Sequence, residues 1–213
     1  MVDHTFLFTS QYQAVKGVIN SGELGRIVHY HATRADFGLF QRDANVLWHL
    51  LYHDLYMVLD LFDGYTIQSI KADGAAHVVN SVEDSAIVSL TFDEGLTAVF
   101  VASLLYPRKE RKVIVAGDER LLCWDYTKDD KVQIFHKSAV WNEQSKHVQY
   151  DVSDQVDNVV LDNKEALQLE VECLVEGLDS GKPFINDGEA ALKVMTILTS
   201  IESAMRTEGL YVR

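Results

Sequence analysis

Apolar residues recur along this chain with two different spacings, and each spacing predicts a different kind of element. Helical spacing appears in residues 10–21 and again from about residue 45 to residue 62. Two more helical segments, residues 164–181 and 187–209, lie near the end of the chain, and Asp187 can cap the second of them. The pattern therefore predicts helices at both ends of the chain and one helix between them.

The middle of the chain has the two-residue alternation of strands. Residues 26–37 alternate in this way, and six further runs follow at residues 66–79, 85–92, 96–106, 111–117, 121–127 and 131–137. Short turn sequences separate most of these runs, and connections this short require antiparallel neighbours because a parallel crossover needs about a dozen residues. The sequence predicts an α+β fold, in which helices pack on one face of an open, mainly antiparallel sheet.

Three local expectations follow from the same patterns. Residues 2–8 form a short apolar run with no earlier strand to pair with, so we expect this strand to pair with a neighbouring molecule or to fray. Residues 150–158 are polar, and we expect a solvated loop there. The last helix should bury an apolar face made of Ala191, Val194, Met195, Leu198, Ile201 and Met205.

Composition and charge narrow the class of protein. The chain has 213 residues, of which 47% are hydrophobic, and its formal net charge is -13. A surface this acidic repels nucleic acid and anionic lipid, and no apolar run reaches membrane-spanning length. The N-terminus has no secretion signal, and Cys123 and Cys173 stand far apart, which favours a reducing cytoplasm over a disulfide framework. We expect one continuous cytoplasmic domain that binds neither nucleic acid nor membranes.

The segment WHLLYHDLY, residues 48–56, holds the most suggestive chemistry. On a helix, one stripe is apolar and consists of Trp48, Leu51, Leu55, Val58, Leu59 and Phe62. Another face is polar and consists of His49, His53, Tyr56 and Asp60. Histidine titrates near neutral pH and suits acid or base catalysis, so this polar face can line a cleft. A solvated helix face explains the same pattern without any function.

A metal site is the second interpretation of this segment. His49 and His53 have the i, i+4 spacing of a zinc-binding histidine pair. Leu50 stands where that motif has its glutamate base, and the sequence offers no obvious third ligand nearby. We therefore expect no metal at this helix.

Two further clusters are candidates for ligand binding. His29 and His31 share one face of a predicted strand, and Arg34 lies near the end of that strand, which suits an anionic or sugar ligand. Residues 106–112 form a basic run that can contact a phosphate or carboxylate, or simply connect two strands. The glycines never fall at the GxGxxG spacing, and no phosphate-binding loop motif occurs.

Several phrases, in their order, resemble the C-terminal domain of the Gfo/Idh/MocA family of NAD(P)-dependent sugar oxidoreductases. The phrases are VDHTFLF at residues 2–8, the segment 15–38, the helix NVLWHLLYHDLYMVLDLF at residues 45–62, the hairpin at 83–100 and the closing segment 181–209. The likeness is greatest to members that act on sugar nucleotides, the UDP-N-acetylglucosamine 3-dehydrogenase type. The fold implied for such a domain is an α+β, dihydrodipicolinate-reductase-like sheet.

The resemblance also implies roles for residues. A full enzyme of the family has an N-terminal Rossmann domain that binds the nicotinamide cofactor, and it uses a lysine of an EKP motif with an Asp and a His on the WDLxxHD helix. The family's His matches His53, the following Asp matches Asp54, and His49 stands at the position of the catalytic Asp. Residues 1–9 resemble the remnant of the last Rossmann strand, and residues 10–213 the substrate-binding and oligomerisation domain. We expect no NAD(P) to bind this chain alone.

The site expected from this resemblance has two parts. His53 and His49 are the candidate catalytic residues, and the candidate substrate-binding residues are Arg34, Trp48, Tyr52 and Asp54. Expected partners are a sugar or sugar-nucleotide ligand, a separate Rossmann-domain chain, and a second copy of the chain, in a dimer or tetramer formed through the open sheet face. The alternative is a non-enzymatic protein that reuses the fold for self-association or ligand sensing, which the replacement at His49 favours.

Overall fold

Eight strands form one mixed sheet in the computed structural model, which describes residues 1–128, 131–162 and 164–207. The strands are β1 (Ile27–Phe37), β2 (Ile67–Ala75), β3 (Ser85–Phe92), β4 (Thr97–Ser103), β5 (Leu105–Gly117), β6 (Leu121–Asp125), β7 (Val132–Asn142) and β8 (His147–Asn158). Their order across the sheet is β2-β3-β4-β1-β5-β6-β7-β8, and every neighbouring pair is antiparallel except β1 with β4.

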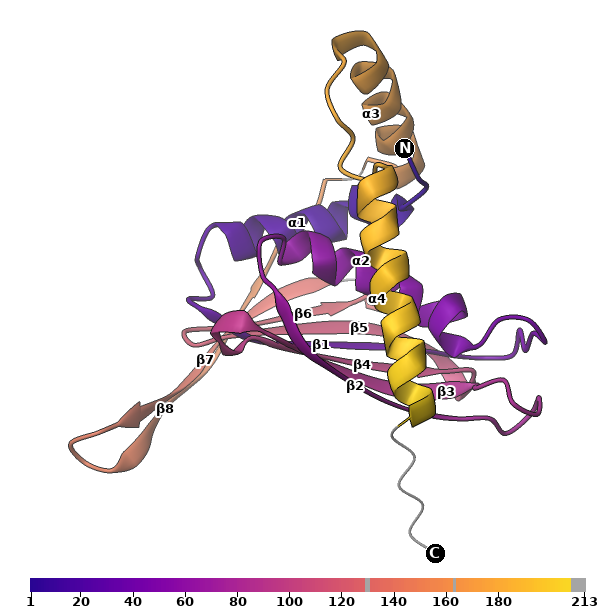
Figure 1. Ribbon diagram of the computed structural model, residues 1–213. Helices are drawn as coiled ribbons and strands as arrows, with labels where there is room; N and C mark the ends of the chain where they lie inside the picture. Colours follow the sequence, from indigo (N-terminus) through magenta and orange to yellow (C-terminus); the bar gives the residue numbers. More distant parts are fainter. Residues whose placement is uncertain (129–130, 163, 208–213) are drawn as a thin grey trace, which may run out of the picture.

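The helices of the described ranges cover one face of this sheet, as the sequence predicts (Figure 1). The α-helices are α1 (Ser10–Asn20), α2 (Tyr52–Leu61), α3 (Ala166–Ser180) and α4 (Gly188–Thr207). Three short elements complete the described chain: the 3-10 helices η1 (Thr5–Phe8) and η3 (Asp93–Gly95), and the π-helix η2 (Leu47–Leu51). Helices α1, α2 and α4 lie over the sheet, whereas α3 projects away from it beside the N-terminus (Figure 1). No helix of the described chain is long and apolar enough to span a membrane.

Alternation along the strands separates two faces of the sheet. On β1, Tyr30, Ala32 and Arg34 are buried under the helices, while His29 and His31 are half-buried on the opposite side. We call the side of the sheet that carries His29 and His31 the outer face. The core lies between the other side and the helices, because the buried residues of β3 and β4 follow the same alternation.

Most of the apolar face predicted for the last helix, α4, is confirmed. The buried members are Val194, Leu198, Ile201 and Met205. Met195 is 40% exposed, so its expected place in the core is wrong. Asp187 caps the N-terminus of α4, as the sequence predicts. Its carboxylate accepts a hydrogen bond from the backbone N–H of Ala190 at 2.9 Å.

The strand predicted for residues 2–8 is wrong. Residues 5–8 form the 3-10 helix η1, which buries Leu7 and Phe8, and the segment before it is tied to the loop that precedes α4. There the backbone N–H of Val2 donates to the carbonyl oxygen of Asn186 at 2.7 Å, and the Asn186 amide donates back to the Val2 carbonyl at 2.5 Å. With its polar groups paired and its apolar side chains buried, the segment neither frays nor needs a neighbouring strand. Its origin as the end of a Rossmann domain stays a prediction.

The loop predicted for residues 150–158 is also wrong, because these residues belong to β8. Strand β8 pairs with β7 in antiparallel register at residues 147–152 and 156–158, with an irregularity between these two stretches. Its apolar residues Val148, Tyr150 and Val152 alternate with polar ones, so the two-residue period is present within a stretch whose overall polarity suggested a loop. The distal part of this hairpin, residues 137–152, extends well beyond the rest of the sheet, and we call it the arm (Figure 1).

Candidate functional site

The helix that carries His49 and His53 begins with an irregular turn. Residues 47–51 form the π-helix η2, and α2 continues from Tyr52 without a break. The side chain of Asn45 accepts a hydrogen bond from the backbone N–H of Leu47 at 3.2 Å, which helps to fix the start of the segment where the sequence predicts it. A π turn inside a helix widens the local spacing and often marks a functional position. The faces of this helix therefore differ from those of a regular α-helix.

A buried ion pair connects this helix to the centre of the sheet. Arg34 donates to the two carboxylate oxygens of Asp54 at 2.6 and 3.0 Å, and their side chains are 2% and 6% exposed. The ring of Phe6 lies 4.9 Å from the Arg34 guanidinium carbon. Although burial disfavours its charge, Asp54 raises the pKa of Arg34 above its ordinary value. Contact of either side chain with a ligand stays a prediction, and their burial counts against it, so we assign the pair a positioning role.

His53 lies beside this ion pair among aromatic rings. Its ring centroid is 5.2 Å from that of Phe6 and 5.9 Å from that of Tyr56, both in edge-on contact. Its Nδ1 atom is buried and has no hydrogen-bond partner in the described part of the chain. Burial, followed by the positive charge of Arg34, lowers the pKa of His53 to about 4. The imidazole is therefore neutral at pH 7 and offers its nitrogens as hydrogen-bonding groups.

A second histidine, His4, joins the cluster from the N-terminal segment, and it is not among the residues predicted from the sequence. His4 is 1% exposed, its Nε2 atom lies 2.7 Å from the Tyr52 hydroxyl, and its ring stacks on Tyr56 at 4.3 Å. Burial lowers the pKa of His4 and raises the pKa of Tyr52. The hydroxyl of Tyr52, a predicted site residue, is thus held in place by His4, which precedes η1 and lies 48 positions earlier in the chain. Nothing local in the sequence signals this contact.

The remaining candidates fall into two groups. Trp48 and His49 are half-buried on the π turn, and His49 contributes to the lowered pKa of His53, so these two lie near the cluster. His29 and His31 do not, because they point to the outer face while Arg34 points to the helices. The expected grouping of His29 and His31 with Arg34 is therefore wrong, and strand alternation is the reason.

The basic run of residues 106–112 lies within strand β5 and is not a connection between strands. In the register of β1 with β5, Arg111 is directly opposite Arg34. Burial and the charge of Arg34 lower the pKa of Arg111, whose charge in turn acts on His53. Arg111 is half-buried, and among the described residues it forms no ion pair. It is the accessible cation beside His53.

A cavity of about 470 Å³ lies next to this cluster, at the other end of α2. His4 and Tyr56 belong to both the cluster and the cavity wall. Its other polar groups come mainly from α2 and the start of α4, where Asp60 pairs with Lys16 at 2.7 Å and Asp63 lies 3.2 Å from Lys193. These carboxylates are partly neutralised by lysines. Within the described ranges, no group of three or more His, Cys, Asp or Glu side chains is arranged to hold a metal ion.

Comparisons with known proteins agree with this geometry. A model of the GFO/IDH/MocA C-terminal domain matches residues 12–122, which include β1, the π turn and α2. The chain belongs to this family. Among curated proteins, a UDP-N-acetylglucosamine 3-dehydrogenase from Acidithiobacillus ferrooxidans is 24% identical over 163 residues, which cover 76% of this chain and 49% of the relative.

Solved structures of family members share the fold. The UDP-N-acetylglucosamine 3-dehydrogenase of Acidithiobacillus ferrooxidans superposes with a TM-score of 0.74 at 21% identity, covering 96% of this chain and 60% of that one. An aldose-aldose oxidoreductase from Caulobacter crescentus gives a TM-score of 0.77 at 15% identity, with 97% and 61% covered. The chain spans about half the length of the curated relative and about three fifths of these two solved structures.

Removing the cation of the buried ion pair should destabilise the protein strongly. In Arg34→Met the Asp54 carboxylate is left buried without its partner, and we expect the free energy of unfolding to fall by about 3–5 kcal/mol. Lys16→Met is the matched control, because it breaks a pair with Asp60 whose side chains are 31% and 19% exposed. That control should cost about 1 kcal/mol or less. Urea unfolding of both variants measures the difference, and equal losses would contradict the assigned role.

The lowered pKa of His53 should be visible by NMR and in the pH dependence of stability. A histidine in an unfolded chain titrates near 6.5, whereas His53 in the folded chain titrates at about 4. Between these values the unfolded state binds more protons, so stability falls as the pH is lowered from 6.5 to 4. In His53→Gln this fall should be smaller. If the imidazole resonances of His53 instead shift with a midpoint near 6.5, the described burial is incorrect.

Proposed function

We propose that this chain is the substrate-binding part of an oxidoreductase that acts on a sugar nucleotide, working together with a nicotinamide-binding domain. The observation that carries the proposal is the neutral His53, which lies beside aromatic rings and next to the half-buried cation Arg111. Aromatic faces suit the apolar faces of a sugar ring, neutral imidazole nitrogens suit its hydroxyls, and a guanidinium suits a diphosphate. The relative named UDP-N-acetylglucosamine 3-dehydrogenase motivates the choice of ligand.

The family's cofactor does not fit the described residues of this chain. A dinucleotide needs a strand, a glycine-rich turn and a helix whose N-terminus meets the pyrophosphate. The sequence has no GxGxxG spacing, and in the described chain the sole parallel pair, β1 with β4, is not joined by such a unit. We therefore derive no hydride-transfer step from these residues, and in this proposal a separate domain binds NAD(P).

An apolar stripe on α3 supports a protein partner on the helix side of the sheet. The stripe consists of Leu167, Val171, Val175 and Leu178, which are 61%, 53%, 53% and 72% exposed. Helix α3 lies next to the N-terminal segment (Figure 1), and the relatives are longer than this chain. Apolar side chains at this spacing form one face of a helix, and such a face is normally covered. We assign it to the cofactor-binding domain.

A second candidate function, ligand sensing without catalysis, is favoured by the titration of His53. A general base works best when its pKa lies near the working pH, and the pKa of His53 is about 4. His49 occupies the position at which the family has its catalytic aspartate. In this alternative the chain binds the same sugar nucleotide, but adding NAD(P) and a family Rossmann domain produces no reduced cofactor. Absorbance of the reduced nicotinamide in that mixture separates the two functions.

Calorimetric titration of the chain with UDP-N-acetylglucosamine tests the proposal directly. We expect saturable binding, which His53→Ala should weaken by about tenfold because a buried hydrogen-bonding group is lost. His147→Ala makes the same substitution at an exposed histidine of the arm tip and should leave the affinity unchanged. An absence of binding to any sugar nucleotide by the unmodified chain would refute the proposal.

Arg111 should account for recognition of the diphosphate. In Arg111→Met we expect the affinity for UDP-N-acetylglucosamine and for UDP to fall about tenfold or more, while any binding of free N-acetylglucosamine is unaffected. Arg108→Met removes an exposed cation from the same strand and is the matched control. If both variants weaken binding equally, the effect comes from net charge and not from a contact at Arg111.

A further inference from the structure

Four buried polar atoms that lack a hydrogen-bond partner in the described chain belong to residues grouped around the ring of Phe6. They are Nη1 of Arg34, Nδ1 of His53, Nε1 of Trp124 and the hydroxyl oxygen of Tyr126. The Arg34 guanidinium carbon lies 4.9 Å from the centre of the Phe6 ring, and the ring centres of His53 and Tyr126 lie 5.2 and 6.0 Å from it. Trp124 stacks on Tyr126 at 4.3 Å. We call these four residues the unpaired cluster. Because an unpaired buried polar group costs stability, such a concentration beside the candidate site indicates a role.

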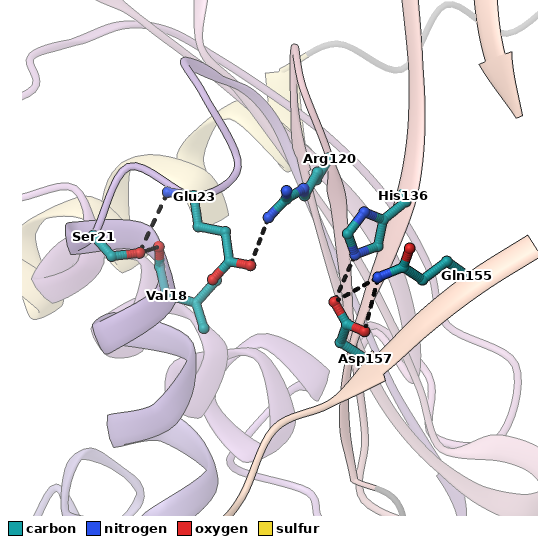
Figure 2. A network of polar contacts seen from close by, with 7 residues as sticks. All are labelled: Val18, Ser21, Glu23, Arg120, His136, Gln155 and Asp157. Carbon is teal, nitrogen blue, oxygen red and sulfur yellow. Dashed lines mark hydrogen bonds and ion pairs between the residues drawn. The ribbon is translucent and has the colours of Figure 1, made fainter. Parts of the chain in front are cut away.

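A histidine at the base of the arm shows how a partner decides which ring nitrogen carries a hydrogen. Nε2 of His136 lies 2.6 Å from the carboxylate of Asp157, to which the Gln155 amide also donates at 3.2 Å (Figure 2). The contact with His136 lowers the pKa of Asp157, so the carboxylate is ionised and only accepts hydrogen bonds. Nε2 of His136 must therefore carry a hydrogen. The same reasoning applies to His53, whose surroundings have the opposite character.

Tyr126 is held next to both arginines of the site. It follows β6 directly, and its backbone N–H donates to the carbonyl oxygen of Arg111 at 3.1 Å. Since Arg111 is opposite Arg34 in the register of β1 with β5, the three residues form a row across the sheet. Burial raises the pKa of Tyr126, and the charge of Arg34 beside its hydroxyl opposes this rise. Tyr126 is thus a neutral phenol whose hydroxyl lies close to the Arg34 guanidinium without the geometry of a hydrogen bond.

The unpaired cluster contains more donors than acceptors. Nη1 of Arg34 and Nε1 of Trp124 can only donate a hydrogen bond, whereas the Tyr126 hydroxyl can donate and accept. Nδ1 of His53 completes the balance only as an acceptor, reached directly or through a water molecule. The Asp54 carboxylate, which would attract an N–H group, is already occupied by two hydrogen bonds from Arg34. The positive charge of Arg34 likewise favours a lone pair on Nδ1 over an N–H group.

The other nitrogen of His53 is the one left for a ligand. Within the described residues Nε2 forms no hydrogen bond, and it is not one of the buried unpaired atoms, so it is open to a ligand. The ring is neutral at pH 7, because burial lowers its pKa to about 4. A neutral imidazole carries one N–H group, so an unprotonated Nδ1 places the hydrogen on Nε2.

We propose that the unpaired cluster holds His53 in a single tautomer, with Nδ1 unprotonated and the hydrogen on Nε2, and that Tyr126 is a positioning residue for this tautomer. The identity of the ligand rests on the proposed function, in which the Nε2–H group donates to an oxygen atom of the sugar. A hydroxyl or carbonyl oxygen can accept this bond, whereas His53 in this form does not accept the hydrogen of a sugar hydroxyl. His53 is then a donor that selects and orients the sugar, and not a general base.

NMR of the full chain at about pH 8 tests the tautomer, because histidine rings are then neutral. The chemical shift of a ring nitrogen depends on whether it carries a hydrogen, and a solvated ring that exchanges between its two tautomers gives averaged shifts. The exposed His147 is the internal reference for such averaging, and His53→Gln identifies the signals of His53. We expect an unprotonated Nδ1 and a protonated Nε2 in His53, without averaging. A protonated Nδ1, or averaged shifts like those of His147, would overturn the proposal.

Tyr126→Phe tests the positioning residue. The variant keeps the ring next to Phe6 and Trp124 but removes the hydroxyl, whose hydrogen can rotate toward Nδ1 of His53. We expect the shifts of His53 to move toward the averaged values of a solvated ring, which a purely structural role of the hydroxyl would not cause. Tyr150→Phe makes the same change at a tyrosine that is 71% exposed and should have no effect. Unchanged shifts in Tyr126→Phe, or equal changes in both variants, contradict the role of Tyr126.

The hydrogen bond to the sugar is tested by adding UDP-N-acetylglucosamine to the same sample. We expect the signals of Nε2 and its hydrogen in His53 to shift as the ligand binds, while Nδ1 stays unprotonated. A second hydrogen on the ring, or transfer of the hydrogen to Nδ1, would show that the ring accepts a proton and would exclude the donor role. The tautomer is measured without ligand, so an absence of binding in calorimetry refutes the proposed function and leaves the tautomer assigned.

Discussion

The ion pair between Arg34 and Asp54 is the contact on which the site depends. Arg34 lies on β1, which pairs with β4 on one side and β5 on the other, and Asp54 lies in the first turn of α2. A bidentate, buried pair of this kind contributes little net stability, but it fixes the rotation of the helix against the strand. That rotation directs His53 into the aromatic cluster. Because the Asp54 carboxylate is already occupied by Arg34, the neighbouring guanidinium of Arg111 is left available.

Much of the fold could be predicted because most of its helices and strands have local sequence patterns. The helices near residues 52–61, 166–180 and 188–207 follow apolar spacing, and the strands of the middle region follow alternation and turn sequences. Two elements could not be predicted in this way. Strand β8 is polar on one face and has a low apolar content, so only its pairing with β7 shows it to be a strand. The apolar content of residues 2–8 predicts a strand, whereas their conformation depends on burial of Leu7 and on the hydrogen bonds between Val2 and Asn186, far away in the sequence.

The candidate site was predicted in its position but not in its contacts. The helix with His53 could be found from its residue types and its family resemblance. The burial of Arg34 and Asp54 could not, because it follows from the register of β1 between two other strands. The contribution of His4 depends on a contact across 48 positions, and that of Arg111 on a cross-strand pair. Sequence patterns report which face of an element is apolar, and they do not report which distant groups share that face.

Strand β1 also separates the candidate site from the outer face of the sheet. Its even-numbered residues, such as Arg34, face the helices and the candidate site, while His29 and His31 point to the outer face of the sheet. The whole chain has a formal net charge of -13. A sugar nucleotide, itself an anion, is therefore repelled as it approaches from a distance. Attraction to Arg111 prevails only within about one Debye length, roughly 8 Å at physiological salt. Recognition of such a ligand in the proposed function relies on close contact with one cation and not on long-range steering. The half-buried guanidinium of Arg111 beside His53 therefore decides whether the site can hold a sugar nucleotide.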